Sequence, residues 1–122
     1  MAAAPIQVVG DDRDTCTSLS DVISDLGYQV DVAYDGPQAL NLSRQRPYGL
    51  ALLDYKLPGM DGVELYVHLK RVRADTVGIL VTAFAADGTL KAAIGAGIRR
   101  VLPKPVDFGC LLALIEEVAG SP

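Results

Sequence analysis

The stretch Leu52–Gly62, LLDYKLPGMDG, closes an apolar run with an acidic residue and then turns sharply. A continuous apolar run before Asp54 predicts a buried strand that carries a carboxylate to its carboxyl end. Pro58 and Gly59 predict a type II turn, because glycine readily takes the positive φ needed at the third position of that turn. Asp61 precedes a helical pattern and is therefore interpreted as a helix cap, not as a second acid of a site.

Five short β-type runs alternate with helical patterns along the rest of the chain. The first, third and fourth runs are almost continuously apolar, which is typical of parallel strands covered on both faces. The strands are predicted at Ile6–Val9, Gln29–Ala33, Leu50–Leu53, Ile79–Val81 and Arg99–Leu102.

Start and stop signals for helices lie between the strands. The first helix shows apolar residues at spacings of three and four, and the fifth repeats that pattern. Aspartates are predicted to cap the second to fifth helices, and glycine or proline to end the first two. These residues are Asp35, Asp61, Asp87 and Asp107 for the caps, and Gly27 and Pro47 for the ends.

The alternation predicts an α/β fold of the (βα)5 type, a flavodoxin-like, doubly wound five-stranded parallel sheet. Right-handed crossovers favour strand order 2-1-3-4-5. No repeat or linker divides residues 1–122, so we expect a single domain.

Composition narrows the functional classes. The chain is 50% hydrophobic and 21% charged, as in globular proteins, and its net charge of −4 argues against a nucleic-acid surface. No apolar run has membrane-spanning length and the N-terminal residues lack a signal-peptide pattern, so no membrane insertion and a cytoplasmic location are expected. Cys16 and Cys110 lack a CxxC spacing and are predicted to be small buried or half-buried thiols.

Polar residues follow four of the predicted strands. Asp11 and Asp12 follow the first strand, Asp54 the third, Thr82 the fourth and Lys104 the fifth. Because parallel strands end at one edge of the sheet, these groups are expected to gather there. Any one aspartate after a strand is more often a helix cap, and Asp12 fits that interpretation. Asp54 does not, since the following helix has its own cap.

The chemistry of this group points to phosphoryl transfer. Asp11 and Asp54 are expected close together, and two like charges call for a compensating proton or cation. Oxygen ligands without His or Cys favour Mg²⁺ over a transition metal. Lys104 supplies a cation and Thr82 a hydroxyl for phosphoryl oxygens. A carboxylate nucleophile with these partners describes phosphoryl transfer to aspartate.

Taken together, VVGDD, LLDYKLPGMDG, ILVTAF and LPKP, in this order, resemble the receiver domain of two-component response regulators over almost the whole chain. The resemblance implies that Asp54 accepts a phosphoryl group from a phosphohistidine of a kinase or phosphotransfer protein. It also implies that Asp11, Asp54 and the Lys56 carbonyl bind Mg²⁺. Thr82 and Lys104 are then expected to contact phosphoryl oxygens, with a cis Lys104–Pro105 bond.

The same resemblance implies a phosphoacceptor that assists its own phosphorylation and dephosphorylation, not an enzyme that turns over an external substrate. The face formed by the fourth helix, fifth strand and fifth helix is expected to bind an output domain or target protein. Lys56 and Phe84 hold positions that tune phosphoryl lifetime in this family, although both also fit ordinary surface residues. His68 is predicted to be a solvated helix residue.

Two positions depart from the family pattern. Gly10 stands where a second acid is usual, so water fills the gap, Asp12 swings in to bind the metal, or Mg²⁺ binds weakly. Val101 stands where an aromatic switch residue is usual, and its single stiff χ1 cannot replace a ring. We therefore expect signalling to depend mainly on Thr82 and on the fourth helix with its preceding loop.

Three other functions fit parts of the sequence. A flavodoxin-like cofactor binder needs a small-residue phosphate loop, but GDDRDT after the first strand is acidic. A haloacid-dehalogenase-like phosphatase needs a second aspartate where Lys56 stands. A pseudo-receiver that binds partners without phosphorylation is favoured by Gly10 and Val101. The sequence fits both a stand-alone regulator and the receiver part of a longer protein.

Overall fold

Parallel strands form the middle layer of the fold in the computed structural model, which describes residues 4–83 and 86–120. The sheet has five strands in the order β2-β1-β3-β6-β7, which confirms the predicted order. A separate antiparallel pair, β4 and β5, follows β3. The strands are β1 (Ile6–Val9), β2 (Val30–Ala33), β3 (Leu50–Asp54), β4 (Lys56–Leu57), β5 (Met60–Asp61), β6 (Val77–Thr82) and β7 (Arg100–Pro103).

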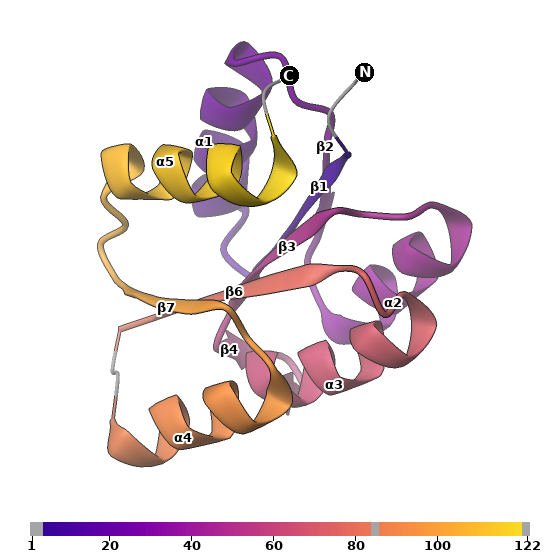
Figure 1. Ribbon diagram of the computed structural model, residues 1–122, viewed down its shortest axis with the longest axis vertical. Helices are drawn as coiled ribbons and strands as arrows, with labels where there is room; N and C mark the ends of the chain where they lie inside the picture. The colour runs from indigo at the N-terminus through magenta and orange to yellow at the C-terminus, as the bar shows by residue number, and fades with distance from the viewer. Residues whose placement is uncertain (1–3, 84–85, 121–122) are drawn as a thin grey trace.

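Helices cover both faces of this sheet (Figure 1). One face carries α1 and α5, and the opposite face carries α2, α3 and α4. Among the described residues, none of the helices has the length and apolar character that a membrane crossing needs. The helices are α1 (Arg13–Asp25), α2 (Gly36–Gln45), α3 (Gly62–Val72), α4 (Asp87–Ala96) and α5 (Phe108–Ala119).

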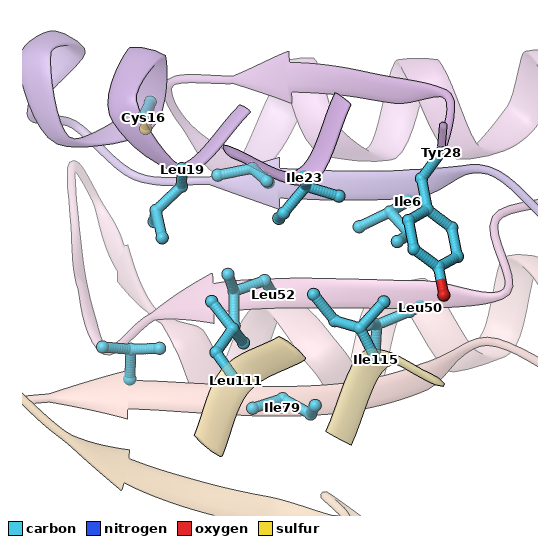
Figure 2. Packing of buried hydrophobic residues seen from close by; sticks show 12 residues of the cluster. Ile6, Cys16, Leu19, Ile23, Tyr28, Leu50, Leu52, Ile79, Leu111 and Ile115 are labelled. Carbon is cyan, nitrogen blue, oxygen red and sulfur yellow. The ribbon is translucent and has the colours of Figure 1, made fainter. Parts of the chain in front are cut away.

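Each face of the sheet has its own core. In Figure 2, Leu19 and Ile23 of α1 and Leu111 and Ile115 of α5 point toward the strand residues between them, which include Leu52. All of these except Leu19 are no more than 2% exposed, and Leu19 is 7% exposed. Two-sided burial explains why the central strands are continuously apolar, since both their faces leave water.

Strand boundaries differ from the prediction where the partner strand decides them. β6 begins at Val77, two residues before the predicted start, because Leu50 of β3 pairs with Val77. Gly78 weakens the strand signal in the sequence. The ring of Tyr66 nevertheless covers this glycine, with an added Cβ lying 2.6 Å from the ring.

Two sequence predictions are wrong at single residues. Asp87 is not the cap of α4: the N-cap is Ala86, which makes no capping hydrogen bond, and Asp87 is the first helical residue. An acid in the first turn still interacts favourably with the helix dipole. Cys110 is exposed, because it lies on the outer side of α5, whereas Cys16 is buried as predicted.

Candidate functional site

Asp54 is the last residue of β3 and lies opposite Val81 of β6. The following residue keeps the strand pairing, since the Tyr55 N–H donates to the Val81 carbonyl at 2.9 Å. Lys104 comes from the segment after β7, and its Nζ donates to Asp54 Oδ2 at 2.9 Å. The side chain of Asp54 is 15% exposed and that of Lys104 36%. The structure thus presents a largely buried carboxylate paired with a more accessible cation.

Thr82 ends β6, the strand that pairs with β3, and is buried, with 4% exposure. The Lys104 N–H donates to the Thr82 carbonyl at 2.9 Å, which fixes the two backbones together. The Lys104–Pro105 peptide bond is cis, as predicted. Thr82 and Lys104 therefore gather with Asp54 at the carboxyl edge, as parallel pairing requires.

The predicted turn after Asp54 is present as the β4–β5 hairpin. Lys56 pairs with Asp61, and Gly59 takes a φ of +79, as the third residue of a type II turn does. Asp61 caps α3 by accepting from the Glu64 N–H at 2.8 Å. Asp61 is therefore a structural acid, as the sequence indicated.

Gly62 contacts β3, the strand that ends at Asp54, and the sequence patterns above did not point to this role. A Cβ at this residue would lie 2.4 Å from the Asp54 carbonyl oxygen and 2.7 Å from Cδ1 of Leu80. Only the absence of a side chain allows α3 to approach β3 so closely. The available signal was a glycine at a helix start, where glycine offers no local advantage over a better helix former.

Asp12 is the N-cap of α1. Its Oδ1 accepts from the backbone N–H groups of Asp14 and Thr15, and its Oδ2 accepts from the Thr15 hydroxyl at 2.9 Å. The hydroxyl bond and the backbone bond from Thr15 lower the pKa of Asp12. Both oxygens already serve the helix, so a metal ion would compete with these bonds for Asp12. Asp11 is exposed in the same loop.

Cys16 lies under this loop, 2% exposed. Its thiol donates to the Gly10 carbonyl with Sγ and oxygen 3.4 Å apart. Burial, and to a lesser extent the charges of Asp54, Asp12 and Asp11, together raise the pKa of Cys16 to about 11. The three carboxylates are therefore close enough to act on one thiol. A cavity of about 490 Å³ opens here, lined among others by Gly10, Cys16, Asp54 and Lys104.

The donor set fits Mg²⁺. Within residues 4–83 and 86–120, no three His, Cys, Asp or Glu residues are grouped so that they could hold a metal ion. Mg²⁺ does not require such a group, because it keeps several waters and binds through one or two carboxylates plus phosphate oxygens. Asp11, Asp54 and the Lys56 carbonyl are the predicted members of such a partial set, and all three offer oxygen atoms, the donor type that Mg²⁺ prefers. Lys104 Nζ donates to Asp54 Oδ2, so Lys104 and a bound metal ion would both interact with the same carboxylate.

The other described residues that the sequence singled out lie on separate elements, β7, α3 and β4. Val101 is half-buried on β7 opposite Leu80 and packs against the core on the α2–α4 face. His68 is exposed on α3, as predicted. Lys56 is exposed in the hairpin. Phe84 lies outside the described residues.

The family profile and the curated relatives that match this chain agree on one protein family. The profile of the response regulator receiver domain matches residues 6–116. A response regulator receiver protein of Anaeromyxobacter sp. (strain Fw109-5) is 36% identical over 107 residues, which are 88% of this chain. The chain spans only 45% of that protein's length.

Solved structures show the same architecture. The receiver domain protein (CheY-like) of Methanospirillum hungatei JF-1 superposes with a TM-score of 0.90 at 30% identity, covering 95% of this chain and 93% of that one. The BeF3 activated DrrB receiver domain gives a TM-score of 0.86 at 27% identity, with 97% of each chain covered. With its sheet order, its acid and lysine at the carboxyl edge and these matches, the chain belongs to the response regulator receiver domain family of two-component signalling.

Proposed function

We propose that this chain is a single receiver domain whose Asp54 accepts a phosphoryl group from a phosphohistidine of a kinase or phosphotransfer protein. The observation that carries the proposal is the ion pair between Lys104 Nζ and Asp54 Oδ2, 2.9 Å apart at the carboxyl edge of the sheet. A cation beside Asp54 would stabilise the negative charge that develops on a transferred phosphoryl group, which supports the proposal. The BeF3 activated DrrB receiver domain, a relative of the same fold, supports this proposal.

The transfer is a substitution at phosphorus. An Asp54 carboxylate oxygen forms a bond to phosphorus while the bond from phosphorus to the donor imidazole nitrogen breaks. The electron pair stays on that nitrogen, which takes a proton. Lys104 then moves from the carboxylate to a phosphoryl oxygen, and the Thr82 hydroxyl donates to another. Asp11, Asp54 and the Lys56 carbonyl, with Asp12 as a further candidate, would hold Mg²⁺, which when bound would compensate the negative charge of the phosphoryl group.

The phosphorylated site is expected to act on a partner surface formed by α4, β7 and α5. Thr82 is the last residue of β6 and Lys104 directly follows β7, so movement of either residue would reach this face through the chain itself. Arg99 and Arg100 are exposed beside it, and Arg99 pairs with Glu117 of α5 at 3.2 Å. The proposed partner is an output domain or target protein, and the proposed location is the cytoplasm.

Acetyl phosphate with Mg²⁺, followed by intact mass measurement, tests the acceptor. We expect the mass of one phosphoryl group on the wild type and on Asp61→Asn, a matched control whose carboxylate lies in the same stretch but caps a helix. Asp54→Asn should remain unmodified. A wild-type protein that gains no mass and shows no NMR change with BeF3 contradicts the proposal.

The second candidate is the pseudo-receiver, favoured by Gly10 and Val101. It requires that partner binding does not depend on Asp54. The same experiment separates the two functions, because a pseudo-receiver shows neither mass gain nor BeF3 response.

A further inference from the structure

Position 10 faces the acceptor carboxylate but has no side chain. Gly10 is buried after β1, and its N–H donates to the Ala33 carbonyl at 3.1 Å. A Cβ built on Gly10 would lie 3.7 Å from Cβ of Asp54 and 3.7 Å from its Oδ2. Any side chain at this position would therefore lie directly beside Asp54.

Cys16 borders the same space. Its Sγ lies 3.1 Å from the Cβ position of residue 10, closer than ordinary van der Waals contact. The thiol donates to the Gly10 carbonyl, so the sulfur cannot move away from position 10 without losing this buried hydrogen bond. In Figure 2, Cys16 lies on the side toward which the strand arrows point, where the site is.

We propose that Cys16 is a positioning residue that excludes a side chain from position 10 and thereby limits the Mg²⁺ affinity of the site. The inference rests on the proposed function, because it concerns the metal that assists phosphorylation of Asp54. Cys16 acts through its volume and is not itself a ligand, since its thiol hydrogen is donated to the Gly10 carbonyl. Removal of Sγ would relieve the 3.1 Å contact at the Cβ position and join this space to the cavity that Gly10 and Asp54 line, which leaves room for an acidic side chain.

Calorimetric titration with Mg²⁺, without any phosphodonor, tests this coupling in a double-mutant cycle. Cys16→Ala alone should leave Mg²⁺ affinity unchanged, because it adds no ligand. Gly10→Asp alone should tighten binding less than about twofold or fail to fold. The double variant should fold and bind Mg²⁺ about tenfold more tightly than the wild type, because one further carboxylate then reaches the ion.

Two further comparisons keep the inference falsifiable. Gly10→Asp combined with Cys16→Val keeps γ atoms beside position 10 and should show no tightening. A second cycle pairs Gly10→Ala, which adds only the Cβ, with Cys16→Ala. Gly10→Ala should lower the urea midpoint of the wild type, but it should lower the midpoint of the Cys16→Ala variant much less. Additive effects in both cycles, or tight binding by Gly10→Asp alone, overturn the inference.

The outcomes also separate this inference from the proposed function. Coupling between positions 10 and 16 without phosphorylation of Asp54 would reject the proposed function and retain the steric effect. Normal phosphorylation of Asp54 with additive cycles would reject the role of Cys16 alone.

Discussion

Replacement of Gly62 by alanine should destabilise the protein strongly although it adds one methyl group. The new Cβ would lie 2.4 Å from the Asp54 carbonyl oxygen and 2.7 Å from Cδ1 of Leu80. Relief of the contact with backbone requires α3 and β3 to separate by about 1 Å. Overpacking of this kind costs about 1–3 kcal/mol, and we expect about 3 kcal/mol because a backbone oxygen cannot rotate away. For a domain of this size the melting temperature should fall by roughly 10 °C.

Gly95→Ala is the matched control, because Gly95 lies in α4 and an added Cβ there meets nothing within 4 Å. It should stabilise the protein by up to about 1 kcal/mol through helix propensity. Urea unfolding followed by circular dichroism measures both variants, and the phosphorylation rate of Gly62→Ala should also fall because Asp54 is displaced. A free energy of unfolding for Gly62→Ala within about 0.5 kcal/mol of the wild type would refute the packing argument.

Three other predictions concern the site. Lys104→Ala should slow phosphorylation by acetyl phosphate at least about tenfold, yet tighten Mg²⁺ binding a few-fold in calorimetry because it removes a competing cation from Asp54; weaker Mg²⁺ binding would contradict this. Asp12→Ala should lower the urea midpoint at neutral pH, and the difference should shrink below pH 3.8, the ordinary pKa, because a lowered pKa stabilises the fold only while the carboxylate is charged. Thr82→Ala should reduce BeF3-induced NMR shifts in α4 more than Val101→Ala does, and equal shifts would exclude a dominant role for Thr82.

Local patterns were sufficient to predict much of the site. The apolar run before Asp54, the Pro58–Gly59 turn and the cap at Asp61 are each set by residues within a few positions of one another, so sequence alone predicted them. The strand order and the gathering of groups at one edge followed from general rules of parallel sheets. The roles of Asp54, Thr82 and Lys104 as phosphoryl-binding residues remain predictions that the experiments above test.

Contacts between distant segments could not be predicted in this way. Asp87 has the residue type of a cap, but α4 begins at Asp87 itself. Cys110 was expected to be at least half-buried, yet its side of α5 faces outward. The extent of β6 depends on pairing with β3, and a glycine within it hides the strand signal.

The sequence by itself determined the alternation of strands and helices, the acid at the end of β3 and the family to which these motifs point, because each depends on local periodicity and spacing. Only the tertiary structure decided that Gly62 lets α3 rest against the Asp54 carbonyl and that Cys16 fills the space beside Gly10. The physical reason is steric: such contacts depend on the separation of packed elements to within a fraction of an ångström.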